Sequence, residues 1–293
     1  MLVDKIRFKK QTCIYNNETV GKKLDKQISV YVVTTRKCNT HCKFCEFHSG
    51  ESDIDTAKLK DILNELGSTT EIHTVHFTGG EPTLELDKIT EICDYIKSID
   101  KCINTSVNTN GTRLKELENI RTLDNIALSR HAITDEENFE IFGSTKVPTC
   151  EQIDAFNEKR KLHLSCNIIK GYVDNLDKIK DYLELAASLD INDVGLVSLM
   201  KINDFCKSNY IDFDMLDNVK TGINNDIVKT KQYRNISDNK ETVCMCENYL
   251  YRASNLKLVS MYHRYAIQNN EIADYLVYEN NHLKQGFNGE III

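Results

Sequence analysis

Short apolar runs alternate with helical stripes from residue 28 to about residue 200. The runs carry branched residues at both odd and even positions, which is typical of strands that are covered on both faces. Each run precedes a polar stretch rich in Asn, Thr, Ser or Gly. The runs are Ile28–Val33, Ile72–Phe77, Cys102–Val107, Ile126–Ser129, Leu162–Ile169 and Val194–Leu199.

Helical stripes separate most of these runs, with Leu and Ile three or four positions apart as on the buried side of a helix. The stripes span Leu59–Leu66, Leu86–Ile99, Leu114–Leu117, Ile153–Phe156 and Leu176–Ala186. Repeated strand–helix units predict parallel strands joined by right-handed crossovers. We therefore expect an α/β fold with its chemistry at the carboxyl ends of the strands.

The pattern changes near residue 201. Asn, Asp and Lys dominate residues 201–241, and strand-like runs return at Leu256–Tyr262, Tyr275–Tyr278 and Gly289–Ile293. We expect three parts: an N-terminal extension over 1–27, the repeated fold over 28–200, and a small β-rich C-terminal unit over 201–293.

Composition and charge exclude several classes of protein. The 293 residues suit one large domain or one domain with an appendage. No apolar run approaches the ~18 residues of a membrane helix. The net charge is −7, which argues against a large nucleic-acid footprint. The N-terminus lacks the apolar stretch of a signal peptide, so the 11 cysteines predict a reducing cytoplasm.

Three cysteines directly follow the first apolar run. Cys38, Cys42 and Cys45 have the spacing C-x3-C-x2-C. Three thiolates can hold three irons of a cubane cluster and leave the fourth open, because a closed cluster normally takes four cysteines. A zinc site, completed by His41 or His48, is the alternative, although zinc sites usually show two cysteine pairs or a Cys/His set. A disulfide framework does not suit an odd number of cysteines.

Polar residues follow the next strands at the corresponding place. Gly79, Gly80 and Glu81 come after the second run, Asn110 after the third, and Ser129 with Arg130 after the fourth. Two glycines let the backbone approach a ligand closely and direct N–H groups at it, and a glutamate can accept a hydrogen bond from an ammonium group.

The cysteine spacing, followed by Gly79-Gly80-Glu81-Pro82 and Thr109-Asn110-Gly111, resembles the radical S-adenosylmethionine (radical SAM) superfamily. The resemblance implies a partial (β/α)6 barrel over residues 28–200. It also implies a [4Fe-4S] cluster on the three cysteines, with S-adenosylmethionine on the open iron. Reductive cleavage would then produce a 5′-deoxyadenosyl radical that takes hydrogen from a C–H bond.

The resemblance also implies roles for single residues. Phe44 would lie near the adenine, Gly79-Gly80-Glu81 would bind the methionyl part, and Ser129 with Arg130 would bind the ribose or the carboxylate. Ile168 would lie against the adenine. Asn110 belongs to Thr-Asn-Gly, a sequence that is familiar at the end of this strand in radical SAM proteins. The alternatives are simple packing for Phe44 and Ile168, a turn role for Asn110, and an exposed Ser129.

Cys206, Cys244 and Cys246 lie outside the strand–helix pattern, in polar surroundings. A cysteine pair before a hairpin, here Tyr249–Tyr251 with Leu256–Val259, resembles the auxiliary-cluster unit called twitch or SPASM. The pair is C-x-C, however, and no cysteine stands near Ser260 or Met261. The alternatives to an auxiliary cluster on these three residues are reduced structural thiols or a thiol that donates hydrogen.

The resemblance leaves the substrate open. We expect a peptide or a small molecule, in peptide modification or in natural-product or cofactor biosynthesis, with a reductant such as flavodoxin or ferredoxin and little oxygen. Residues 1–27 are too short for a leader-binding domain. Cys-Lys-Phe-Cys-Glu-Phe-His and the segment Ser129–Gly143 also resemble viperin, a nucleotide-modifying family. A non-catalytic iron–sulfur protein for sensing or electron transfer is the alternative from another class.

Overall fold

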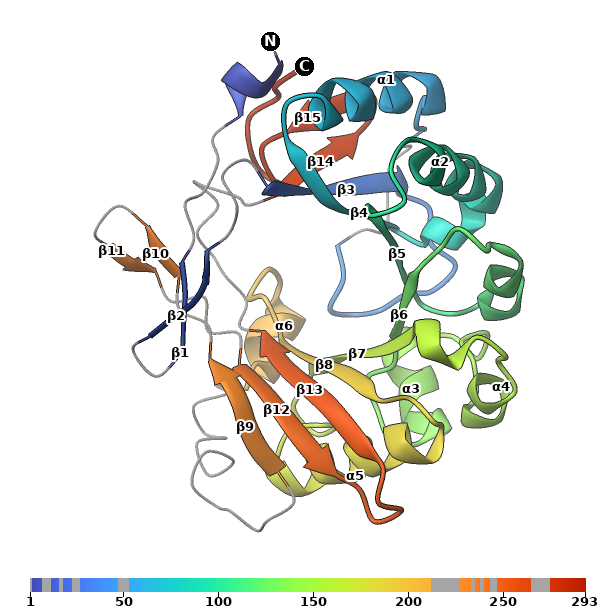
Figure 1. Cartoon of the computed structure of the whole chain (residues 1–293). Coiled ribbons are helices and arrows are strands. Elements are labelled where there is room, and N and C mark those ends of the chain that lie inside the picture. Colours follow the sequence, from blue (N-terminus) through green and yellow to red (C-terminus); the bar gives the residue numbers. More distant parts are fainter. Residues whose placement is uncertain are drawn as a thin grey trace.

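The fold is built on one large, mostly parallel sheet. The computed structural model describes residues 2–6, 12–15, 18–22, 27–46, 53–211, 227–232, 235–237, 240–242, 247–264 and 275–293. Among these residues, eleven strands pair in the order β15-β14-β3-β4-β5-β6-β7-β8-β13-β12-β9. The sheet curves into an open, incomplete barrel with helices on its outer side (Figure 1).

The six predicted strands form the centre of this sheet, and each pairs in parallel with the next. They are β3 (Gln27–Thr35), β4 (Glu71–Gly79), β5 (Asn104–Thr109), β6 (Asn125–Ser129), β7 (Leu162–Ile168) and β8 (Asp193–Ser198). The structure thus confirms the expected α/β fold with a partial (β/α)6 barrel.

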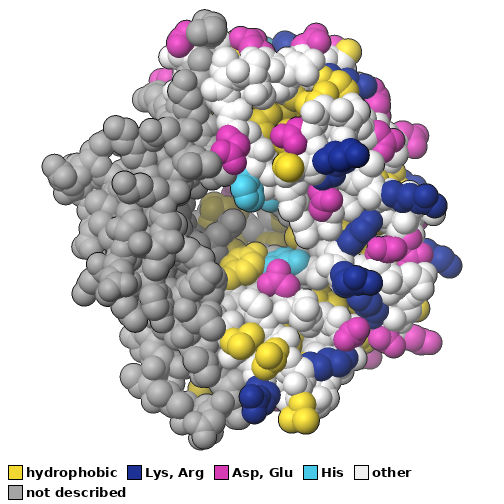
Figure 2. All heavy atoms as spheres, viewed as in Figure 1, with side chains coloured by type: hydrophobic (Ala, Val, Ile, Leu, Met, Phe, Trp, Pro, Cys, Tyr) yellow, Lys and Arg dark blue, Asp and Glu magenta, His cyan; other side chains and the backbone are white. Residues whose placement is uncertain are grey.

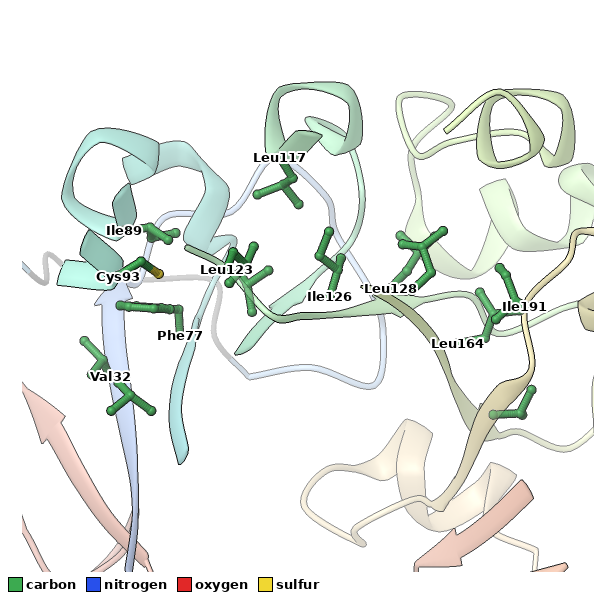
Figure 3. Close-up of a cluster of buried hydrophobic side chains, with 14 of the residues drawn as sticks. Val32, Phe77, Ile89, Cys93, Leu117, Leu123, Ile126, Leu128, Leu164 and Ile191 are labelled. Carbon is green, nitrogen blue, oxygen red and sulfur yellow. The ribbon is translucent and has the colours of Figure 1, made fainter. Parts of the chain in front are cut away.

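The core lies between the strands and the outer helices. Alternate strand residues, including Val32, Phe77, Ile126 and Leu164, point to the helical side and meet helix residues such as Ile89 (Figure 3). The predicted helical stripes correspond to α1 (Thr56–Gly67), α2 (Leu86–Ile99), η3 (Leu114–Asn119), α4 (Cys150–Asp154) and α5 (Leu176–Ser188). The other side of each central strand therefore faces the inside of the barrel, called the lumen below.

Several short elements have no counterpart in the predicted pattern. The most important is α3 (Asp135–Phe142), an acidic helix that buries only Asn138, Ile141 and Phe142. Its ends are nevertheless marked, since Thr134 caps the first turn and Gly143 adopts a left-handed conformation after the last. The others are η1 (Leu2–Lys5), η2 (Pro82–Glu85), η4 (Lys159–Lys161), α6 (Asp204–Asn209), the pair β1 (Thr12–Tyr15) and β2 (Glu18–Lys22), and the pair β10 (Asn235–Ser237) and β11 (Lys240–Thr242).

The described strands after residue 201 extend both edges of the same sheet. β13 (Leu258–Arg264) pairs in parallel with β8, followed outward by β12 (Glu247–Arg252) and β9 (Ile227–Gln232). At the other edge, β14 (Tyr275–Glu279) pairs in parallel with β3 and carries β15 (His282–Lys284). The expected hairpin is present as β12–β13, but these strands share the barrel sheet because each edge offers unpaired backbone groups.

The two ends of the chain lie close together (Figure 1). Lys5 Nζ donates to the Ile292 carbonyl at 3.5 Å, and Leu2 N donates to Glu65 on α1 at 2.8 Å. In the described part of the chain, no helix combines the length and the apolar composition that crossing a bilayer requires.

Candidate active site

The cysteine loop begins where β3 ends, at the carboxyl edge of the parallel strands. Thr40 lies between two of its thiols, with Oγ1 at 3.2 Å from Cys38 Sγ and at 3.6 Å from Cys42 Sγ. The Cys45 N–H donates to the Cys42 carbonyl at 3.1 Å, which forms a turn. The loop therefore gathers the three thiols at one place.

Cys42 is the most enclosed of the three thiols. Burial, with a smaller contribution from the neighbouring Cys45 and Cys38, raises the pKa of Cys42 to about 12. A buried thiol of this kind stays protonated until a cation replaces the proton, because a bound metal stabilises the thiolate directly. The electrostatics therefore suit a cationic metal cluster in contact with all three sulfur atoms.

Asn110 holds the cysteine loop from the end of β5. Its side-chain amide donates to Asn39 Oδ1 at 2.8 Å and to Thr40 Oγ1 at 3.4 Å, and it lies 3.9 Å from Cys38 Sγ. Its own oxygen accepts from the Thr112 N–H at 3.0 Å. Asn110 thus lies beside the thiols, as the sequence predicted, and its contacts show how it positions the loop.

Glu81 is buried and bonds to protein groups through both carboxylate oxygens. Oε1 accepts from the Thr83 N–H at 3.0 Å, the Thr83 hydroxyl at 2.6 Å and the Thr109 hydroxyl at 2.7 Å. Oε2 accepts from the Asn110 N–H at 2.7 Å. Burial raises the pKa of Glu81, against the lowering effect of these hydrogen bonds. The carboxylate thereby joins the turn after β4 to the end of β5, next to Asn110.

The two glycines before Glu81 allow the closest backbone approach in the site. A Cβ on Gly79 would lie 2.2 Å from the Thr35 carbonyl oxygen, and one on Gly80 would lie 2.3 Å from the Lys37 oxygen. Both distances are impossible for a side chain, so only glycine fits. The Gly80 N–H donates to Thr35 and the Glu81 N–H to Lys37, each at 2.8 Å. We expected these N–H groups to face a ligand; instead they attach the turn to the start of the cysteine loop.

The other side of the cysteine loop contacts α3 and His131. The His41 N–H donates to the Phe142 carbonyl at 2.9 Å, and the His131 ring lies between Phe142 and Phe44, with centroids 5.0 Å from each. His131 Nδ1 accepts from the Asn167 N–H at 3.0 Å, and burial lowers the pKa of His131 to about 3. His131 is therefore a neutral residue that supports Phe44, a role that the sequence alone did not indicate.

Ser129 and Arg130 point to opposite sides of β6. Ser129 occupies a lumen-facing position, as its proposed contact with S-adenosylmethionine requires. Arg130 points to the helical side, where it is fully buried, pairs with Asp135 at 2.9 Å and donates to the Ile133 carbonyl. Its guanidinium therefore lies on the side away from the lumen, where we expected the cofactor, because adjacent strand residues face opposite ways.

Ile168 differs from the expectation for the same reason. It lies in the core cluster beneath the outer helices. The next residue, Ile169, packs in a separate cluster with Phe44, Ala132 and Leu199. Ile169, unlike Ile168, thus lies on the same side as Phe44, since a shift of one residue moves a side chain to the other face of a sheet.

Cys206 lies against the cysteine loop from α6. Its thiol donates to the Phe44 carbonyl at 3.4 Å, and Asn203, which caps α6, donates to the Lys43 carbonyl at 3.3 Å. Burial raises the pKa of Cys206. These contacts describe a protonated thiol packed among apolar side chains. Cys244, Cys246 and His48 lie outside the described residues.

The donor set of the loop fits an iron–sulfur cluster. In the ranges that the structure describes, no three His, Cys, Asp or Glu side chains converge on one point as a single metal ion would require. Three neighbouring thiols on one loop suit a cubane, where each thiolate binds a different iron. Cys38, Cys42 and Cys45 would hold that cluster.

Comparisons with known proteins agree with this site. The model of the radical SAM superfamily matches residues 32–186, more than half of the chain. A probable GTP 3′,8-cyclase of Saccharolobus islandicus is 29% identical over 182 residues, which is 57% of this chain and 56% of that protein. One from Thermoplasma volcanium is 32% identical over 170 residues, covering 55% of this chain and 50% of that protein. The chain thus spans about half the length of these relatives.

Solved structures share the fold at low sequence identity. SuiB of Streptococcus suis, in its crystal structure with bound S-adenosylmethionine, superposes with a TM-score of 0.56 at 13% identity, over 90% of this chain and 62% of SuiB. A radical SAM methyltransferase from Sphaerobacter thermophilus gives 0.53 at 14% identity, over 68% of this chain and 63% of that chain. From the matched model and the site together, we conclude that the chain belongs to the radical SAM superfamily and is an enzyme of that class, which uses a [4Fe-4S] cluster and S-adenosylmethionine.

Proposed function

We propose that this enzyme removes hydrogen from a polar but uncharged small molecule, in cofactor or natural-product biosynthesis. When bound, the reduced cluster and S-adenosylmethionine supply the radical that breaks the C–H bond. The chain must orient the substrate beside the cysteine loop and exclude water from the reacting carbon. An electron donor such as flavodoxin or ferredoxin would reduce the cluster.

The lining of the lumen carries this proposal. The residues that alternate with the core positions of β5–β8 are mostly Asn and Ser, and Asp193 is the one carboxylate or cation among them. These positions are Asn104, Ser106, Asn108, Asn125, Ala127, Ser129, His163, Ser165, Asn167, Asp193, Gly195 and Val197. Figure 2 shows a hollow in the middle of this face, bordered by histidine and hydrophobic side chains.

A wall of amides and hydroxyls suits hydroxyl and amide groups of a substrate, because each can both donate and accept hydrogen bonds. A polyphosphate would need Arg or Lys partners, which these four strands do not direct into the lumen. The relatives named probable GTP 3′,8-cyclase favour a nucleoside-like small molecule over other classes. The polar, mostly uncharged lining favours binding of the uncharged part of such a molecule in the lumen.

Peptide modification is the second candidate. The same Asn and Ser side chains could pair with the amides of a peptide backbone. Asn125 Nδ2 already donates to Asn104 Oδ1 at 2.7 Å, so amide groups on this wall are arranged to pair with one another. A peptide backbone could pair with the amide donors and acceptors of Asn104 and Asn125 that this bond does not use.

Paired probes distinguish the two candidates. Anaerobic reduced enzyme with S-adenosylmethionine would be given neutral nucleosides and sugars, each beside its phosphorylated counterpart, with guanosine and GTP as the first pair. We expect the neutral member to raise 5′-deoxyadenosine formation more than the phosphorylated one. Deuterium should pass from a labelled C–H bond of the active probe into 5′-deoxyadenosine. Stimulation by GTP with none by guanosine would contradict the proposal, and stimulation only by blocked peptides would favour peptide modification.

Iron counting tests the auxiliary cluster proposed from Cys206, Cys244 and Cys246. Reconstituted wild-type protein with two cubanes would hold about eight irons, and the triple alanine variant about four. We expect Cys206→Ala alone to keep the wild-type iron content, because its thiol packs against Phe44. A loss of about four irons from this single variant would instead make Cys206 a ligand.

A further inference from the structure

Three polar residues from neighbouring strands form a continuous hydrogen-bonded chain in the lumen. Asp193 on β8 lies with Oδ2 at 2.9 Å from His163 Nδ1 on β7. The Tyr262 hydroxyl on β13 lies 3.0 Å from His163 Nε2. The Tyr262 and His163 rings are nearly parallel, at an interplanar angle of 4° and a centroid distance of 5.2 Å.

The order of the partners assigns the protons. A carboxylate can only accept, so Asp193 requires the hydrogen of the imidazole on Nδ1. The Nε2 atom of a neutral imidazole then accepts, and the Tyr262 hydroxyl donates to it. The phenol thus has a base behind it, and that base is in turn fixed by a carboxylate.

Gly195 provides the space for this arrangement. A Cβ at Gly195 would lie 2.5 Å from Tyr262 Cζ and 2.5 Å from its hydroxyl oxygen, and 2.8 Å from His163 Nε2. Any other residue at this position of β8 would separate the phenol from the imidazole. A glycine inside a strand marks such a close approach, and it was the signal available in the sequence.

The hydrogen-bonded residues Asp193, His163 and Tyr262 face the lumen. Val259 and Met261 on β13 are buried in the core, so Tyr262, the residue after Met261, faces the lumen. Ser129, Ser165, Gly195 and Tyr262 are register partners across β6, β7, β8 and β13. At about 4.8 Å per strand, Tyr262 lies roughly 14 Å along the sheet from Ser129. Tyr262 is half-buried, and the side chains of His163 and Asp193 are 14% and 49% exposed, so a solute can reach the phenol as well as the carboxylate.

We propose that Tyr262, His163 and Asp193 form a proton relay that accepts a proton from a hydroxyl or ammonium group of the substrate. The substrate group gives its proton to the Tyr262 oxygen as the Tyr262 hydroxyl gives its own to His163 Nε2. The products are the deprotonated substrate group, neutral Tyr262 and an imidazolium held by the Asp193 carboxylate. No electrons are transferred in this step. The relay rests on the proposed function only in requiring that a substrate occupy the lumen.

A sulfonyl fluoride tests the relay without a substrate. Phenylmethanesulfonyl fluoride joins its sulfur to a phenol oxygen and releases fluoride, while the phenolic proton passes to a base. Anaerobic holoenzyme would be labelled, and modification of each tyrosine would be read by peptide mass spectrometry. The reference is Tyr95 on the outer side, whose hydroxyl donates to the Lys60 carbonyl at 3.4 Å and not to a base. We expect preferential labelling of Tyr262.

Two variants establish the cause of that labelling. His163→Gln should slow labelling of Tyr262 at least tenfold, because the base is lost, and Asp193→Asn should slow it several-fold. Labelling of Tyr95 should not change. Absence of Tyr262 labelling in the wild type, or a rate unchanged by His163→Gln, would overturn the relay.

Turnover provides a separate readout. With the probe that stimulates the wild type most, Tyr262→Phe should lower kcat about 10²-fold or more, as removal of a proton-transfer group does, with little change in KM. Tyr251→Phe is the matched control, since its hydroxyl binds Glu184 on α5 at 2.6 Å, and it should keep wild-type turnover. If no probe stimulates turnover, the proposed substrate class fails while the labelling result still decides the relay; a wild-type kcat in Tyr262→Phe overturns it.

Discussion

Replacement of Cys42 by alanine should abolish reductive cleavage of S-adenosylmethionine, and Cys38→Ala or Cys45→Ala should do the same. Each thiolate would be the protein ligand of one iron, so a loop with two thiolates would leave a second iron without a protein ligand. Thr40 and Asn110 offer no replacement thiolate, since they contact the sulfur atoms only through a hydroxyl and an amide. The measurements are 5′-deoxyadenosine formation by reduced enzyme and iron content after anaerobic reconstitution.

Cys93→Ala is the matched control for this experiment. Cys93 lies in the core on α2, and burial raises the pKa of its thiol to about 12, as for Cys42. The two thiols therefore have similar burial and a similar pKa, but only Cys42 lies in the cysteine loop. We expect Cys93→Ala to lose some stability and to keep full iron content and cleavage. Retained cleavage in any of the three loop variants would show that the loop does not hold the cluster.

Glu81→Ala should lower the free energy of unfolding by about 3 kcal/mol or more. The carboxylate accepts hydrogen bonds from Thr83, Thr109 and Asn110 in a buried place, and each buried donor left without a partner costs about 1–3 kcal/mol. Because Asn110 in turn holds Asn39 and Thr40, the loss should also loosen the cysteine loop. Chemical denaturation and the iron content measure the two effects.

Two further variants sharpen this result. Glu81→Gln keeps the shape of the side chain but places an NH2 group among donors, so it should also destabilise the fold. Glu85→Ala removes a partly exposed carboxylate that lies 3.5 Å from Lys88, and should change stability by less than about 0.5 kcal/mol. If Glu81→Ala left stability unchanged and only weakened S-adenosylmethionine binding, the side chain would contact the ligand directly, as first expected from the sequence.

The central strands could be predicted because their pattern is local. A strand covered on both faces needs a branched apolar run, and an outer helix needs a stripe of period 3.6, so β3–β8 and α1, α2 and α5 are visible in the sequence. The helix α3 was missed because only three of its residues are buried and its first turn is acidic. Its caps, Thr134 and Gly143, were the available signal.

The site was predicted in part. Cysteine spacing predicted Cys38, Cys42 and Cys45 as cluster ligands, and the structure places Asn110 beside Cys38 and Glu81 beside Asn110. The side chains of Arg130 and Ile168 lie on the helical side, since a position at a strand end does not determine which face a side chain occupies. The positions of His131 and Cys206 could not be predicted from single residues. Both contact Phe44, which lies far from them in the sequence.

The amino-acid sequence by itself determined the periodicity of the barrel, the order of its strands and the loop that presents three thiolates, because each depends on residues close together in the chain. Only the tertiary structure decided what meets across the lumen and which strands complete the edges. Tyr262 meets His163 across Gly195, and β14 reaches β3 from the far end of the chain. Contacts of this kind depend on register, curvature and the direction of side chains on neighbouring strands, and no local pattern of residues specifies them.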